Sequence, residues 1–317
     1  MIFASFATAV GVLGARRLAH WAILRGLRAP RVPHALQAAD LGLAADRVSE
    51  VRIPGPRGRA LSAWLVMPPS GTTNGADSPV PAVLAMHGWG GNAAMMGPVV
   101  PPLHAAGFAV LLIDARCHGR SDGEAFTSMP RFAEDIAAGL AWLRQQPGIA
   151  PDRLALLGHS VGAAAALLHA SRHDDVRAVV SLSAFAHPAE VMRRFMAGKR
   201  VPYPVLGWYV MRRVQRVIGS SFDDIAPVNT IRRVRCPVLL VHGRHDSTVP
   251  FDDASRLRAA HPGARLLSVA GDHDLRQALV PHTHSLVGFL SQALRTFEAA
   301  PVCGPLPLLH CAHERPA

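Results

Sequence analysis

A serine between two glycines is the feature of this chain best suited to do chemistry. Ser160 lies in the segment Gly158-His159-Ser160-Val161-Gly162, after an apolar run and before an alanine-rich stretch. A serine hydroxyl becomes a useful nucleophile only when a neighbouring base accepts its proton. Small flanking residues allow a strand and a helix to approach closely around a tight turn that exposes the hydroxyl. The pattern therefore predicts a nucleophile at a strand–turn–helix junction.

A base and a residue to orient it follow later in the chain, each after a further apolar run. Asp246 follows the run 237–243, and His273 follows the run 264–271. Ligands bind outside the carboxyl ends of the strands in open α/β sheets, so the three side chains are expected to meet there. The order Ser, Asp, His is that of a nucleophile, its orienting acid and its base on such a sheet. Alternatives left open are Asp252 or Asp253 for the acid and His282 or His284 for the base.

A glycine-rich loop follows the first core run and suits an oxyanion hole. The loop is formed by His87, Gly88, Trp89, Gly90 and Gly91. Stabilising a tetrahedral intermediate requires backbone N–H donors aimed at the developing oxyanion. The expected donors are the N–H groups of Trp89 and of Val161, the residue after the nucleophile. The other interpretation of this loop is an ordinary glycine-rich turn.

The elements that must position these residues alternate between short apolar runs and helical periodicity. Nearly continuous apolar runs are typical of parallel strands buried on both faces. In 130–146, Phe132, Ile136, Leu140 and Leu143 recur at helical spacing. This alternation predicts an α/β fold with a doubly wound, mostly parallel sheet. The predicted strands are 81–87, 108–114, 153–159, 176–183, 237–243 and 264–271, with a hairpin over 48–67.

The predicted catalytic domain covers residues 48–295 and contains an insertion. Residues 185–235 are apolar and arginine-rich, and they are too long for an ordinary connection, so we expect an inserted helical lid over an apolar pocket. Residues 299–317 form a proline-rich tail.

Residues 1–28 are expected to form a hydrophobic or interfacial helix. The first fifteen residues carry no charge and arginines follow them, the reverse of a cleaved secretory signal. Fifteen apolar residues are also fewer than the roughly 20 that span a bilayer. We expect association with a membrane surface, with the catalytic domain in the cytoplasm. The alternatives are a helix packed on its own domain and an uncleaved or misassigned leader.

The net charge of +11 comes from two segments only. Residues 1–59 carry +6, residues 185–235 carry +7, and the remaining residues carry −2. The body of the protein is therefore not basic, and no nucleic-acid motif is present, so no nucleic-acid partner is expected. Four cysteines do not make a disulfide framework and fit a reducing compartment. The oligomeric state is left open.

With these motifs in place, the chain resembles the α/β-hydrolase family, in particular its serine aminopeptidase and acyl-peptidase-like esterases. The resemblance covers about residues 48–295 and includes the loop 114–123, DARCHGRSDG, which matches a D-x-R-x-H-G-x-S pattern expected to shape the floor of the site. It departs from the family at Asp272, where many members have glycine before the histidine.

The resemblance implies a Ser160-His273-Asp246 triad that hydrolyses a small-molecule ester, thioester or amide through an acyl-enzyme. His87, Gly88, Gly90, Gly158, His159 and Gly162 would support it, with no cofactor and no metal. Cys303, His310, Cys311 and His313 lack the spacing of a standard zinc site. Other functions considered are a peptidase, an acyltransferase or cofactor-free haloperoxidase, and a non-catalytic binding protein.

Overall fold

The computed structural model describes residues 14, 16–69 and 78–295. The predicted tail over 299–317, its cysteines and histidines, and most of the first fifteen residues lie outside this part of the chain.

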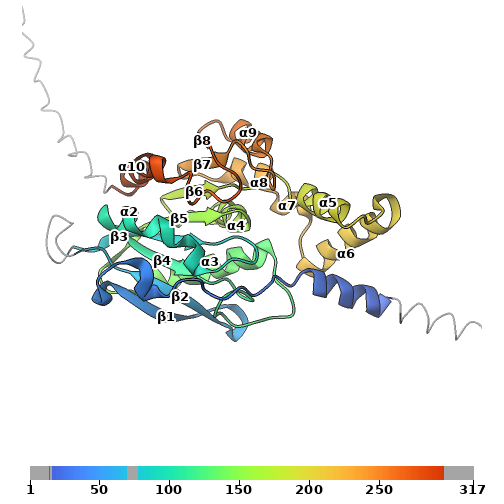
Figure 1. The fold of residues 1–317 in the computed structure, drawn as a ribbon, viewed down its shortest axis with the longest axis horizontal. Helices are drawn as coiled ribbons and strands as arrows, with labels where there is room; N and C mark the ends of the chain where they lie inside the picture. The colour runs from blue at the N-terminus through green and yellow to red at the C-terminus, as the bar shows by residue number, and fades with distance from the viewer. Residues whose placement is uncertain (1–13, 15, 70–77, 296–317) are drawn as a thin grey trace, which may run out of the picture.

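One sheet of eight strands forms the centre of the molecule, in the order β1-β2-β4-β3-β5-β6-β7-β8 (Figure 1). The pairs β1/β2 and β2/β4 are antiparallel, and every pair from β4/β3 to β7/β8 is parallel. The strands are β1 (Val48–Pro54), β2 (Ala60–Val66), β3 (Val80–Met86), β4 (Ala109–Ile113), β5 (Ile149–His159), β6 (Ala178–Leu182), β7 (Val238–Gly243) and β8 (Arg265–Val269). The predicted α/β class and its mostly parallel sheet are confirmed.

Each central strand contributes to two apolar cores because successive side chains point to opposite faces of a sheet. In β3, Leu84 and Met86 join one buried cluster, whereas Val83 and Ala85 join the other. Helices α3 and α4 complete the first cluster, and α2 and α10 complete the second. Burial on both faces explains why the strands appear in the sequence as continuous apolar runs.

Helices cover both faces of the sheet (Figure 1). The α-helices are α2 (Val100–Ala105), α3 (Met129–Leu143), α4 (Val161–Ala170), α5 (Pro188–Gly198), α6 (Trp208–Ile218), α7 (Phe222–Ile225), α8 (Pro227–Thr230), α9 (Phe251–Ala260) and α10 (Thr283–Leu294). Short 3-10 turns are η1 (Ala38–Leu41), η2 (Ala45–Arg47), η3 (Pro56–Gly58), η4 (Ala93–Val99), η6 (Ile231–Arg233) and η7 (Val280–His282), and η5 (Tyr203–Gly207) is a π turn.

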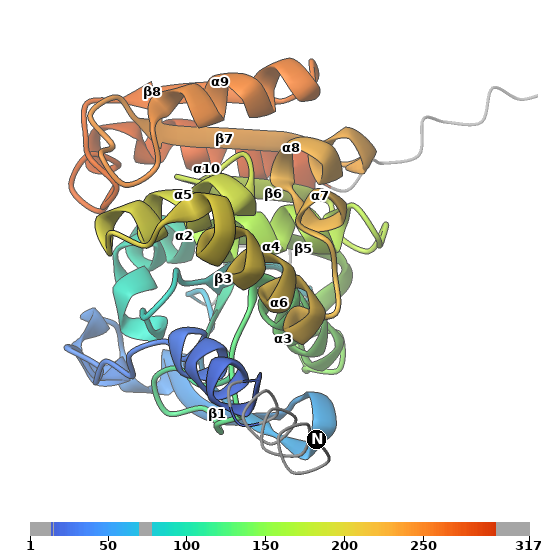
Figure 2. The same cartoon turned by 90° about the vertical axis from the view of Figure 1, so that its right-hand side faces the viewer.

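The segment between β6 and β7 is largely helical, and its two ends pack into the core beside the sheet. We call residues 185–235 the β6–β7 insertion; it contains α5, η5, α6, α7, α8 and η6. In Figure 2, α5 and α6 lie across the end of the molecule that faces the viewer.

Residues 16–26 are helical, and we call them the N-terminal helix. Ile23 of this helix is buried with Met211 and Val214 of α6, so the helix packs on the β6–β7 insertion. Both views show it beside α6 (Figures 1 and 2). Within the described ranges, no helix combines the length and hydropathy needed to cross a bilayer.

A buried ionic cluster fixes the loop that follows β4. Arg116 is fully buried; its Nε donates to Asp135 Oδ1 at 2.6 Å, and its Nη1 and Nη2 donate to Glu124 and Glu134. The backbone N–H of Arg116 also donates to Asp135 Oδ2 at 2.9 Å. Asp135 lies on α3, so the cluster ties the 114–123 loop to the helix beneath it.

Replacing Arg116 with methionine should destabilise the fold strongly, because Asp135 would remain buried without its counter-charge. We expect a loss of about 3–5 kcal/mol in the free energy of unfolding, measured by urea denaturation. The matched control is Arg52→Met, which removes a half-exposed ion pair with Asp122 and should cost about 1 kcal/mol or less. Equal losses in the two variants would contradict the importance assigned to the cluster.

Candidate active site

Ser160 lies at the sharp junction between β5 and α4. Its φ of 53° and ψ of −116° are strained for a residue with a side chain. A Cβ on Gly158 would collide with the backbone of Gly162 and Ala163, and one on Gly162 would collide with the carbonyls of Met86 and His87. Both positions therefore require glycine because three backbone segments meet there.

A continuous chain of hydrogen bonds links the three residues predicted from the sequence. His273 Nδ1 lies 2.8 Å from Asp246 Oδ2, and His273 Nε2 lies 3.1 Å from Ser160 Oγ. An ionised carboxylate only accepts, so Nδ1 carries the proton and Nε2 is free to accept one from Ser160. The site residues proposed from the sequence thus lie together in the geometry that general-base activation of a serine requires.

The carboxylate of Asp246 is buried and well satisfied. Its Oδ1 accepts the backbone N–H groups of Thr248 and Val249 at 2.9 and 2.7 Å. Burial by itself raises the pKa of Asp246, but hydrogen bonds from His242, His273 and Val249 outweigh it and hold the pKa well below its usual range. Asp246 is therefore ionised at any pH at which His273 can act as a base.

His242 is a neighbour of Asp246 that the sequence patterns did not reveal. Its ring Nε2 donates to the carbonyl of Val249 at 2.9 Å and lies 3.4 Å from Asp246 Oδ2. His242 lies at the buried end of β7. In the sequence it is one polar residue at the end of an apolar run, and no pattern connects it to Asp246.

His159 connects the nucleophile to the loop of the base. Its Nε2 donates to the carbonyl of His273 at 2.9 Å, and the two rings lie 5.0 Å apart. Burial lowers the pKa of His159, which keeps the ring neutral. A neutral ring at this position orients the His273 loop without adding a second positive charge beside the base.

His87 holds the glycine-rich loop from inside. Its Nδ1 lies 2.7 Å from the carbonyl of Gly88, and its Nε2 accepts the N–H of Ala115 at 3.0 Å. These two partners fix the tautomer with the proton on Nδ1. Burial lowers the pKa of His87, so the ring remains neutral and connects the loops that follow β3 and β4.

His118 holds the same loop from the other side. Its Nε2 accepts the N–H of Gly90 at 3.1 Å, and its Nδ1 donates to the carbonyl of Arg116 at 2.9 Å. Burial lowers the pKa of His118 to about 3, and the neighbouring His87 contributes to this decrease to a smaller extent. The sequence predicted that the loop 114–123 lies under the site. It could not predict the hydrogen bond between Gly90 and His118, because this bond forms only when the fold brings the two loops together.

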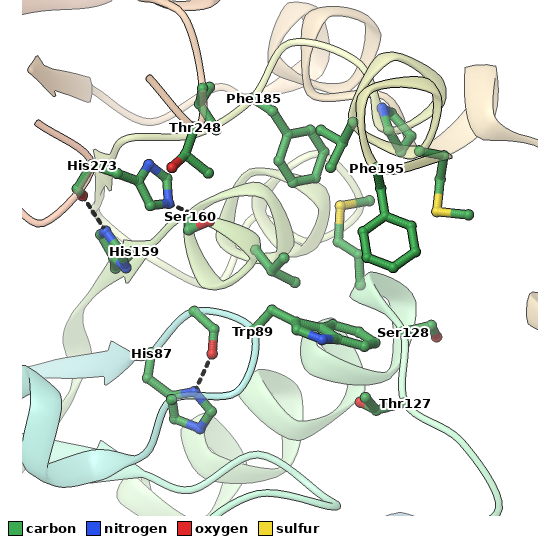
Figure 3. Close-up of a pocket in the computed structure, with 18 of the residues that line it drawn as sticks. His87, Trp89, Thr127, Ser128, His159, Ser160, Phe185, Phe195, Thr248 and His273 are labelled. Atoms are coloured by element: carbon green, nitrogen blue, oxygen red, sulfur yellow. Dashed lines mark hydrogen bonds between the residues drawn. The ribbon is translucent and has the colours of Figure 1, made fainter. Parts of the chain in front are cut away.

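The two expected oxyanion donors are available. Among the described residues, no hydrogen bond involves the backbone N–H of Trp89 or of Val161. Val161 is the first residue of α4, so its N–H lies at the positive end of that helix. The Trp89 loop and Ser160 lie at the same cavity (Figure 3).

A large apolar cavity of about 1070 Å³ lies over Ser160. Phe185 and Phe195 line it from the β6–β7 insertion, and Trp89 lines it from the glycine-rich loop (Figure 3). Three other large side chains of the β6–β7 insertion do not line the cavity: Tyr203 and Trp208 are exposed, and Met211 is buried with Ile23 of the N-terminal helix.

The alternative acids and bases are placed elsewhere. Asp253 lies on α9 and pairs with Arg256 at 3.3 Å, and Asp252 precedes it on the same helix. His282 and His284 lie in η7 and α10. Among the histidines of the described residues, only His273 lies within hydrogen-bonding distance of Ser160 Oγ.

Asp272, where the sequence departs from the resembling family, accepts the backbone N–H of Asp274 at 2.9 Å. Asp274 in turn pairs with Arg276, whose Nε lies 2.8 Å from Asp274 Oδ1. The carboxylates of Asp272 and Asp274, on either side of His273, therefore form hydrogen bonds within their own loop.

Comparison with known proteins agrees with this geometry. Residues 77–222 match the family model of the serine aminopeptidases, S33. The Pyrococcus furiosus esterase Pf2001 superposes with a TM-score of 0.66 at 22% identity, covering 85% of this chain and 98% of that one. The chain has an α/β-hydrolase fold, and its residues 77–222 are similar to this family of serine aminopeptidases.

Two curated relatives are also similar in sequence. An uncharacterized Mycobacterium tuberculosis protein, Rv2307c, is 32% identical over 203 residues, which are 64% of this chain and 63% of that protein. The Escherichia coli esterase YjfP is 25% identical over 231 residues, which are 69% of this chain and 91% of YjfP. The chain thus aligns with less than two thirds of the mycobacterial relative.

The neutral histidines predict how stability depends on pH. His118 binds no proton in the folded protein until about pH 3, whereas the unfolded chain binds one near pH 6.5. The unfolded state therefore gains protons first, and stability falls as the pH decreases below about 6.5. His118 alone should remove about 2 kcal/mol between pH 7 and pH 5. In urea denaturation, His118→Phe should reduce this pH dependence by that amount, and an unchanged dependence would contradict the assignment.

Proposed function

We propose that this protein hydrolyses carboxylic esters of apolar acids by a Ser160-His273-Asp246 mechanism. The observation that carries the proposal is the position of His273, hydrogen-bonded to both Ser160 Oγ and Asp246, at the floor of an apolar cavity. Apolar lining favours substrates whose acyl or alcohol part is a hydrocarbon.

The steps follow from the proton positions described above. His273 Nε2 takes the proton of Ser160 as Oγ attacks the ester carbonyl, and Asp246 stabilises the resulting imidazolium. The N–H groups of Trp89 and Val161 bind the oxyanion. The tetrahedral intermediate collapses, and His273 returns the proton to the departing alcohol. Water then attacks the acyl-serine with His273 again as the base and releases the acid.

Cleavage of amides with a free amino terminus is the alternative within the same family. Such a substrate needs a free carboxylate near the site to bind its ammonium group. The carboxylate of Asp274 already pairs with Arg276, and that of Asp272 accepts the Asp274 N–H. Asp274 is therefore paired, and the largely apolar lining of the cavity favours esters over aminoacyl substrates.

Ser160→Ala should abolish covalent labelling by a fluorophosphonate probe and reduce hydrolysis of p-nitrophenyl esters by at least about 10⁴-fold, because no nucleophile remains. Ser171, at the other end of α4, donates to the carbonyl of Leu168, so Ser171→Ala is the matched control and should retain labelling. Equal labelling of Ser160→Ala and wild type would refute the mechanism. Faster cleavage of aminoacyl p-nitroanilides than of any ester would favour the peptidase.

We infer further that the protein docks on anionic lipid surfaces through its N-terminal helix and the neighbouring part of the β6–β7 insertion. Both elements expose large apolar side chains and pack against one another. We call these side chains the apolar rim: Leu18, Trp21, Val205, Leu206 and Trp208.

Basic side chains accompany the apolar rim. Arg212 lies over the ring of Trp208 at 5.1 Å, and Arg16, Arg17 and Arg25 are exposed on the N-terminal helix. Apolar side chains beside arginines match the combined hydrophobic and electrostatic attraction of an anionic membrane surface.

The double variant Trp21→Ser/Trp208→Ser should weaken sedimentation with vesicles of phosphatidylglycerol, because it removes two aromatic side chains from the proposed contact. Wild type should bind these vesicles more strongly than phosphatidylcholine vesicles and less strongly at high salt. Leu36→Ser changes an exposed apolar residue outside the apolar rim and serves as the control. Binding that is absent, or equal in all three proteins, would rule out this surface.

A further inference from the structure

The N-terminal helix forms part of the wall of the cavity over Ser160. Ala19, Ala22, Ile23 and Gly26 recur at the spacing of one helical face, and all four line the cavity. Val210 and Val214 of α6 line the same cavity. The cavity is therefore bounded by a segment that precedes the hydrolase domain in the sequence as well as by the insertion within it.

Apolar packing holds this helix in place. Ile23 is only 8% exposed and belongs to a buried cluster with Met196 of α5 and Val214 of α6. Leu27, one turn further on, packs against the same cluster and also lines the cavity. The side chains that dock the helix thus also border the space available to a ligand.

The chain that follows the helix is tied to the body by polar contacts. The carbonyl of Leu27 accepts the N–H of Thr127 at 3.0 Å, and Arg28 Nε donates to the carbonyl of Ala125 at 3.1 Å. Arg31 donates to the carbonyl of Ser121 at 3.0 Å. These three contacts join the N-terminal segment to residues 121–127, after β4.

A buried pair continues this attachment towards the oxyanion loop. His34 Nε2 lies 2.9 Å from Asp114 Oδ2, and both side chains are almost inaccessible to solvent. Asp114 also accepts the N–H groups of Ala93 and Arg120. Asn92 Nδ2 donates to the carbonyls of Val32 and Pro33. The N-terminal segment is thereby fixed to the loops that carry Trp89 and His118.

We propose that the N-terminal helix is a specificity-determining wall of the acyl-binding site. This proposal rests on the proposed esterase function. It adds that one face of the N-terminal helix, which borders the cavity together with α6, limits the length of acyl chain that can bind. This face consists of Ala19, Ala22, Ile23 and Gly26. Small side chains on this face leave space for a medium or long chain, and larger side chains would occupy that space. The cavity, at about 1070 Å³, is far larger than an acetyl group requires.

Gly26 is suited to test this proposal in the full-length protein. A Cβ at Gly26 meets no atom within 4 Å, so the backbone there accepts a side chain without a collision at its first atom. Gly26→Leu should lower kcat/KM for p-nitrophenyl decanoate by at least about tenfold and leave kcat/KM for p-nitrophenyl acetate within about twofold. The physical reason is steric: leucine would fill part of the space available to the longer chain and would not touch the reacting atoms. Ala22→Leu, on the same face, should act in the same direction.

His20→Leu is the matched control because it adds leucine to the same helix at an exposed position that does not line the cavity. This variant should leave kcat/KM unchanged for both p-nitrophenyl decanoate and p-nitrophenyl acetate. Equal effects of Gly26→Leu on decanoate and acetate, or a decanoate loss in His20→Leu as large as in Gly26→Leu, would overturn the inference. If wild type hydrolyses neither ester and shows no fluorophosphonate labelling at Ser160, the proposed function itself is wrong, and the inference falls with it.

Discussion

The close approach of three backbone segments at Ser160 is the constraint on which the site depends. The end of β5, the start of α4 and the loop after β3 meet so tightly that neither Gly158 nor Gly162 has room for a Cβ. The strained φ and ψ of Ser160 cost on the order of 1–3 kcal/mol. Sheet pairing on both sides of β5 and burial of α4 offset that cost. The same contact brings the start of α4 against the loop after β3, so one steric arrangement positions both the proposed nucleophile and the proposed oxyanion donors.

Three buried, neutral histidines hold the backbone segments around Ser160 in place. His87, His118 and His159 each connect two backbone segments, and burial keeps each of them uncharged. In the proposed mechanism, positive charge is therefore left to form on His273, which is hydrogen-bonded to the carboxylate of Asp246. Fixed dipoles that need no rearrangement during a reaction are the kind of environment that stabilises a transition state.

Local patterns were sufficient to predict the sheet and the residues at its carboxyl edge. Apolar runs over 81–87, 153–159 and 237–243 correspond to β3, β5 and β7, because strands buried on both faces leave a strong local signal. The pairing of β2 with β4 and the contact of His118 with Gly90 had no such signal, since they join residues far apart in the chain. The placement of the N-terminal helix was hidden for a further reason. An apolar helix with scattered arginines is compatible with a lipid surface and with packing on its own domain, and only tertiary contacts such as that of Ile23 with Val214 show which side of the helix packs on the domain.

The attachment of the N-terminal helix also has a consequence for biosynthesis. A chain is made from its N-terminus, so residues 16–26 leave the ribosome before β1 exists and long before α5 and α6 can cover them. Until α6 has been made, Ile23 and Leu27 lack the apolar neighbours that bury them in the finished protein. Contacts between such distant residues are also slow to form. The cavity over Ser160 can therefore close only after α6 has been made, and a nascent chain arrested before α6 would carry an apolar helix without its partners from α6.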